Sequence, residues 1–107
     1  MVDESIRLTV QAYLRAAREA GIDVREGILF GSHARGEAHE WSDIDLVVIA
    51  AEMDIHPSRK LVEKLWELRV KTDSRIEPIA CGVEEWETNQ DRPILEIARR
   101  EGIVIAA

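Results

Sequence analysis

Residues 43–50, with the sequence DIDLVVIA, constrain the fold of this chain more than any other segment. Valine and isoleucine dominate the run, and such β-branched residues are typical of a β-strand. Because side chains alternate along a strand, Asp43 and Asp45 share one face, whereas the opposite face is apolar and can pack against helices. Acids inside a strand lower stability unless a cation lies against them. The segment therefore predicts both a strand and a cation site.

The rest of the chain alternates between helical and strand patterns. Apolar residues at helical spacing predict helices over residues 3–20, 57–70 and 93–102, the last two opened by prolines. Short apolar runs predict further strands over residues 25–30, 75–81 and 103–107. Residues 33–41 and 83–89 are expected to form turns or single helical turns, and residues 52–57 a loop. This order predicts one small α/β domain over residues 1–107.

Pro78 fixes the place of one strand within the sheet. A proline has no N–H to donate to a neighbouring strand, so we expect the strand over residues 75–81 to lie at an edge or to be irregular at Pro78. Cys81 ends the same strand in an apolar run without a basic neighbour, which indicates a buried structural thiol. As the single cysteine, it forms no internal disulfide, which is typical of a reducing cytoplasm.

The net charge of the chain limits which kinds of molecule it can bind. The 107 residues carry a formal net charge of −7, and no basic patch stands out. Direct binding of a nucleic-acid backbone is therefore disfavoured, whereas a small anion carried by metal ions, or a basic protein, is allowed. No apolar stretch reaches the ~18 residues of a membrane span. The acidic start lacks an export signal, so we expect a cytoplasmic protein without a membrane anchor.

Gly31 and Ser32 stand between the predicted strand over residues 25–30 and the start of a predicted helical turn. Glycine lets a backbone approach a ligand closely. Free N–H groups at such a turn, together with the Ser32 hydroxyl, can hold a phosphate. Asp43 and Asp45, ~6–7 Å apart at their Cα atoms, can bind one Mg²⁺ or straddle two. The Gly-Ser turn is thus expected to bind a triphosphate, and the aspartate pair to bind the metal ion that neutralises its charge.

These motifs together resemble a known family. The chain reads GSHARG, five residues, then SDIDLVV. This is similar to the nucleotidyltransferase superfamily typified by DNA polymerase β, and in size to its minimal nucleotidyltransferases, the MntA-like antitoxins. Gly31-Ser32 matches the first half of the family signature, and Asp43 and Asp45 match its Asp-x-Asp half. The resemblance implies a polymerase β-like α/β fold, with a short mixed sheet flanked by helices.

The resemblance also implies a third carboxylate on a later strand. Glu77 is the strong candidate, to complete a metal site with Asp43 and Asp45 or to act as base on the attacking hydroxyl. A salt bridge at the sheet edge is the alternative for Glu77. Arg35 either contacts phosphate or holds the turn through a salt bridge with a nearby acid, and the sequence leaves both open.

The implied reaction is Mg²⁺-dependent transfer of a nucleoside monophosphate, AMP from ATP, to a hydroxyl acceptor. Family members of this size modify a tyrosine of a HEPN toxin and so act as antitoxins. Two other functions remain open. One is a catalytically silent module that neutralises a partner by binding. The other is transfer to a small molecule, for which this chain would supply a substrate-holding domain only as a homodimer.

Overall fold

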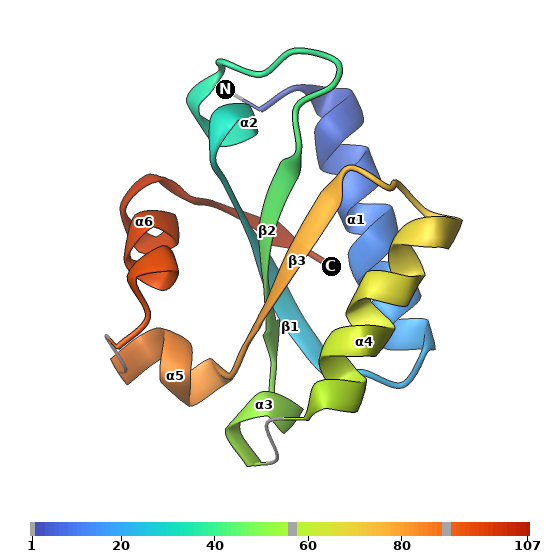
Figure 1. Ribbon diagram of the computed structural model, residues 1–107, viewed down its shortest axis with the longest axis vertical. Coiled ribbons are helices and arrows are strands. Elements are labelled where there is room, and N and C mark those ends of the chain that lie inside the picture. The colour runs from blue at the N-terminus through green and yellow to red at the C-terminus, as the bar shows by residue number, and fades with distance from the viewer. Residues whose placement is uncertain (1, 56–57, 89–90) are drawn as a thin grey trace.

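The computed structural model describes residues 2–55, 58–88 and 91–107, and its centre is a four-stranded mixed sheet (Figure 1). The strands, in the order β3-β2-β1-β4 across the sheet, are β3 (Ile76–Cys81), β2 (Ile44–Ala50), β1 (Val24–Phe30) and β4 (Ile103–Ala106). β2 and β3 run parallel, whereas β1 is antiparallel to both β2 and β4. The expected α/β fold with a short mixed sheet is confirmed.

Helices cover both faces of the sheet. α1 (Glu4–Glu19) and α4 (Arg59–Glu67) lie on one face, and α5 (Val83–Thr88) and α6 (Pro93–Glu101) lie on the other (Figure 1). Each side has its own apolar core: Leu14 of α1 and Leu65 of α4 belong to one, and Leu95 of α6 belongs to the other. The sheet is thus the middle of three layers.

β2 is the central element because both of its faces are buried. Ile44, Leu46 and Val48 enter the core under α1 and α4, and Val47 and Ile49 enter the core under α5 and α6. The alternation expected for residues 43–50 is confirmed. From Val47 onward, the face of β2 that carries the aspartates is covered by the core. Only the first residues of the strand can therefore contact a ligand.

The first helix and the strands match their expected bounds closely. The first expected turn, over residues 33–41, consists of the short helix α2 (Ser32–Arg35) followed by an irregular segment. The second, over residues 83–89, is the short helix α5, with residue 89 outside the described residues. The expectation of a loop over residues 52–57 is wrong, because Glu52–Ile55 forms the short helix α3. This helix is held by a residue distant in the sequence: the Glu52 carboxylate accepts the Asp23 N–H at 2.8 Å, which fixes the turn against the segment between α1 and β1.

The helix expected over residues 57–70 begins, among the described residues, at Arg59. Pro57 lies outside the described residues, and the Ser58 side chain accepts the Leu61 N–H at 3.4 Å as the cap. After α4 the chain tightens into a 3₁₀-helix, η1 (Leu68–Lys71). No helix in the described parts of the chain is both long and apolar enough to cross a membrane.

β3 is an edge strand, as Pro78 predicts. Cys81 at its end is buried, which confirms the structural thiol, and burial raises the pKa of that thiol to about 12. The thiol donates a hydrogen bond to the Gly82 carbonyl at 3.3 Å.

Arg99 fastens α6 to α5. Its Nε donates to the Trp86 carbonyl and its Nη2 to the Glu85 carbonyl, both at 3.0 Å. The guanidinium also lies 4.9 Å from the centre of the Trp86 ring. Carbonyls near the end of a short helix lack partners within the helix, so these bonds satisfy α5 and fix α6 over the second face.

The substitution Arg99→Met should lower the free energy of unfolding by about 1–3 kcal/mol, because two carbonyls lose a charged donor. Urea denaturation followed by circular dichroism measures this loss. The exposed neighbour Arg100→Met is the control and should leave the midpoint nearly unchanged. Equal midpoints for the two variants would contradict the role of Arg99.

Candidate active site

An open cavity of about 370 Å³ lies at the start of β2, between the end of β1 and α6. Five of the six predicted site residues line it: Gly31, Ser32, Arg35, Asp43 and Asp45. The other lining residues are Phe30, Ser42, Ile94, Ile97 and Glu101. The cavity therefore brings the Gly-Ser turn and the aspartate pair together, as the sequence predicts.

Gly31 is packed directly against the Asp45 carboxylate. Its φ of 78° and ψ of −154° lie in a region that only glycine adopts readily. A Cβ added to Gly31 would lie 2.2 Å from Asp45 Oδ2, far closer than any real contact. Because β1 and β2 pair with Phe30 opposite Asp45, the next residue along β1 must pass this carboxylate. The site needs glycine here for both space and conformation.

α2 carries Ser32 and Arg35 in one turn after Gly31. The Gly31 carbonyl accepts the N–H groups of Ala34 and Arg35, each at 3.1 Å, which closes the turn. The Arg35 guanidinium donates Nε to Glu37 at 2.5 Å and Nη1 to Glu101 at 3.0 Å. The salt-bridge alternative for Arg35 is thus observed, although the side chain also lines the cavity.

Three carboxylates lie near one another where β2 and β3 begin, without converging on one point. Asp43 is exposed just before β2, Asp45 is half-buried within it, and Glu77 lies opposite Asp45 in the parallel pairing of β3. Burial raises the pKa of Asp45, and the Asp43 charge raises it further. Burial also raises the pKa of Glu77, followed by the charges of Asp43 and Asp45. The three groups are near enough to repel one another.

This donor set fits a hard divalent cation. Carboxylate oxygens are the ligands that Mg²⁺ prefers, and a bound cation would relieve the repulsion that raises both pKa values. Glu77 is set slightly apart, since it does not line the cavity. Within the described residues, no three acidic, histidine or cysteine side chains already meet at one metal position.

Glu101, Ile94 and Ile97 are the cavity residues that sequence reasoning missed. They occupy positions i, i+3 and i+7 of α6 and so share one face of that helix. Glu101 Oε1 accepts the Gly31 N–H at 3.0 Å. Helical spacing could have grouped the three residues. Only the packing of Leu95 and Ala98 into the core, however, decides that this face borders the cavity.

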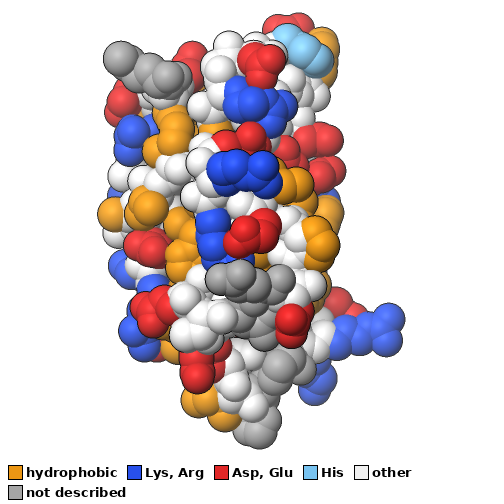
Figure 2. Space-filling view, turned by 90° about the vertical axis from the view of Figure 1, so that its left-hand side faces the viewer, with side chains coloured by type: hydrophobic (Ala, Val, Ile, Leu, Met, Phe, Trp, Pro, Cys, Tyr) orange, Lys and Arg blue, Asp and Glu red, His pale blue; other side chains and the backbone are white. Residues whose placement is uncertain are grey.

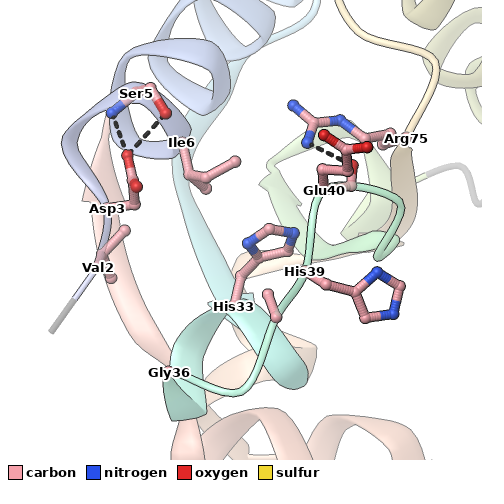
Figure 3. Close-up of a pocket in the computed structure, with 10 residues that line it drawn as sticks. Val2, Asp3, Ser5, Ile6, His33, Gly36, His39, Glu40 and Arg75 are labelled. Atoms are coloured by element: carbon pink, nitrogen blue, oxygen red, sulfur yellow. Dashed lines mark hydrogen bonds between the residues drawn. The ribbon is translucent and has the colours of Figure 1, made fainter.

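A second, wider cavity of about 640 Å³ lies between the start of α1, α2 and the segment that follows α2 (Figure 3). His33, His39 and Arg75 line it, but none of the six predicted site residues does. Two of its charged groups have partners: Asp3 accepts from Ser5 at 2.6 Å, and Arg75 donates to Asp73 at 2.7 Å. The predicted site residues therefore gather at the smaller cavity, not at the larger one.

Figure 2 shows the side of the molecule that carries α6, where basic and acidic side chains are interspersed. Ion pairs account for this mixture. Arg92 pairs with Glu85 at 3.2 Å, and Arg35 pairs with Glu37 and Glu101. The arginines of these pairs are thus partly neutralised rather than gathered into a basic patch.

Comparisons with known proteins agree with the geometry. A family model described as a nucleotidyltransferase domain matches residues 11–98. A protein of Methanocaldococcus jannaschii, named provisionally as protein adenylyltransferase MJ1305, is 45% identical over 47 residues, which is 44% of this chain and 30% of that protein. A solved structure described as a toxin-antitoxin with AMP-PNP superimposes with a TM-score of 0.63 at 21% identity, over 92% of this chain and 71% of that one. The latter likeness shows the shared fold.

Gly31 and Gly36, the two positive-φ glycines at the ends of α2, should differ sharply in their tolerance of substitution. Gly36→Ala meets no atom within 4 Å and should cost only the backbone strain, about 1–2 kcal/mol. Gly31→Ala adds a clash with Asp45 and a rarer backbone conformation, so it should cost about 3 kcal/mol or more. Urea denaturation of both variants measures the difference. Equal losses would show that Asp45 does not press on Gly31.

The acidic cluster should reduce stability in the absence of divalent metal. Glu77→Gln removes one of two like charges opposite each other on paired strands, and should raise the free energy of unfolding by roughly 0.2–1 kcal/mol at neutral pH. The pKa of Glu77 is higher in the folded state than in the unfolded state, so its ionised carboxylate lowers stability at neutral pH. This loss of stability disappears as falling pH protonates Glu77. The gain should therefore shrink in acid.

Thermal unfolding in EDTA at two pH values measures the effect. Glu87→Gln, an exposed acid on α5, is the control and should change little. A Glu77→Gln variant less stable than the wild type at neutral pH would contradict the repulsion.

Proposed function

Because this chain belongs to the nucleotidyltransferase family, we propose that it transfers AMP from ATP to a hydroxyl group of a partner protein. The acceptor that we propose is a tyrosine of a HEPN toxin, which makes the chain an antitoxin acting in the cytoplasm. The observation that carries the proposal is the contact of the Gly31 backbone with the Asp45 carboxylate in one cavity, since phosphate and metal must meet there.

The comparisons support adenylyl transfer to a protein. The relative from Methanocaldococcus jannaschii is named for protein adenylyltransferase activity, and the structural neighbour is a toxin-antitoxin with an ATP analogue. The chain spans only 30% of the first protein's length, and the second shares 21% identity. Acceptor and nucleotide are therefore inferences from the likeness together with the site.

Each site residue has a proposed role. Gly31 N–H, Ser32 Oγ and the Arg35 guanidinium bind phosphate oxygens. Asp43, Asp45 and Glu77 are the residues that would hold Mg²⁺. When bound, the ion neutralises the triphosphate and polarises the α-phosphorus.

The proposed chemistry needs a single proton acceptor. The acceptor hydroxyl oxygen forms a bond to the α-phosphorus, the bond to the bridging oxygen of the β-phosphate breaks, and pyrophosphate leaves. The hydroxyl proton passes to a carboxylate, and Glu77, opposite Asp45 on β3, takes it where Asp43 and Asp45 alone hold the ion. Most of the acceleration comes from positioning and from charge neutralisation.

Labelling of the partner tests the proposal. With ATP labelled at the α-phosphate, Mg²⁺ and a HEPN toxin as the proposed partner, the partner should become labelled, whereas label at the γ-phosphate should not be transferred. Asp45→Asn should lower the rate at least about 100-fold, because the metal loses a ligand. Glu87→Gln is the control with normal transfer.

Two outcomes would overturn the proposal. One is an unlabelled partner at all Mg²⁺ concentrations. The other is an Asp45→Asn variant as fast as the wild type. If the partner is neutralised without becoming labelled, a silent binding module would be favoured instead.

A further inference from the structure

We propose that Glu101 is a built-in counter-anion, whose carboxylate binds the same groups that bind phosphate and must be displaced by the triphosphate. The inference deepens the proposed function and rests on it. It assigns a role to a residue 70 positions away from the Gly-Ser turn along the chain.

The contacts of one oxygen atom carry the argument. Glu101 Oε1 accepts the Gly31 N–H at 3.0 Å and the Arg35 Nη1–H at 3.0 Å. A backbone N–H and a guanidinium that converge on one anionic oxygen form the arrangement in which proteins hold phosphate oxygens. The same two groups are those that we assign to the triphosphate. The carboxylate and the phosphate therefore compete for the same donors.

Charge makes this contact unusual. The cavity already contains Asp43 and Asp45, and among the described residues that line it Arg35 is the only cation. The Glu101 charge also contributes to raising the pKa of Asp45. A third acid is tolerated because Arg35 and Gly31 hold it. Its side chain remains 25% exposed, so it has a path to solvent.

The backbone under Glu101 is held firmly. A Cβ at Gly102 would lie 2.2 Å from the Ala98 carbonyl oxygen and 2.4 Å from the Ile28 side chain, so the end of α6 is pressed against β1. Arg99 anchors the same helix to α5. The helix therefore stays in place, and displacement requires only rotation of the Glu101 side chain toward solvent.

A different role for Glu101 makes the opposite prediction. If its carboxylate instead bound the metal together with Asp43 and Asp45, its removal would weaken the binding of the metal-nucleotide complex. As a competitor, its removal must strengthen binding. The sign of the change in affinity separates the two roles.

Calorimetric titration with ATP and Mg²⁺, and separately with inorganic tripolyphosphate, tests the proposal on the full chain. Glu101→Gln keeps the side-chain length but loses the charge, and should bind both ligands about tenfold more tightly than the wild type. A glutamine amide at position 101 can still accept the Gly31 N–H. Glu101→Ala removes that contact as well, and should also bind both ligands more tightly than the wild type. Thermal unfolding of each variant establishes that it is folded.

Glu37→Gln is the matched control, because Glu37 also pairs with Arg35 but contacts neither Gly31 nor the cavity. The affinity of the Glu37→Gln variant for either ligand should differ from that of the wild type by less than about twofold, as expected for an exposed ion pair. Wild-type affinity, or weaker binding, in both Glu101 variants would overturn the competitor role alone. Loss of ATP binding in every variant, wild type included, would overturn the proposed function with it.

Discussion

The contact between the Gly31 backbone and the Asp45 carboxylate is the constraint on which the rest of the site depends. β1 and β2 pair so that Phe30 faces Asp45, and the chain then turns at once into α2. A side chain at residue 31 would push this carboxylate away or open the turn. The Gly-Ser turn and the acidic strand are therefore one unit, held together by a single antiparallel pairing.

The carboxylates in this part of the structure repel one another electrostatically. Asp43, Asp45 and Glu77 stand on neighbouring strands with pKa values raised for two of them, and Glu101 adds a fourth acid nearby. A protein selected for stability alone would not gather acids at one end of its sheet. The proposed cation site needs them there, and the apolar cores on the two faces of the sheet supply the stability that this arrangement lowers.

The sequence predicts most of the fold because its signals are local. The β-branched run of β2, the Gly-Ser turn and Pro78 at an edge each follow from the residues involved, and the structure agrees with all three. The loop expected at residues 52–57 fails because α3 depends on a distant bond from Asp23 to Glu52. Glu77 could be named from the sequence, but its position opposite Asp45 depends on strand register.

α6 shows why the remainder could not be predicted. Its pattern gives a helix and a buried stripe, but Glu101 looks like any acid at the end of a helix, where its charge opposes the helix dipole. An acid in that position is unfavourable unless it has another partner, and the partners, Gly31 and Arg35, lie on α2 and just before it. The unfavourable position of an acid at the end of α6 was therefore visible in the sequence, but its explanation required the packing of α6 against β1. Residues that violate a local preference are those to examine first when a functional site is completed by a distant element.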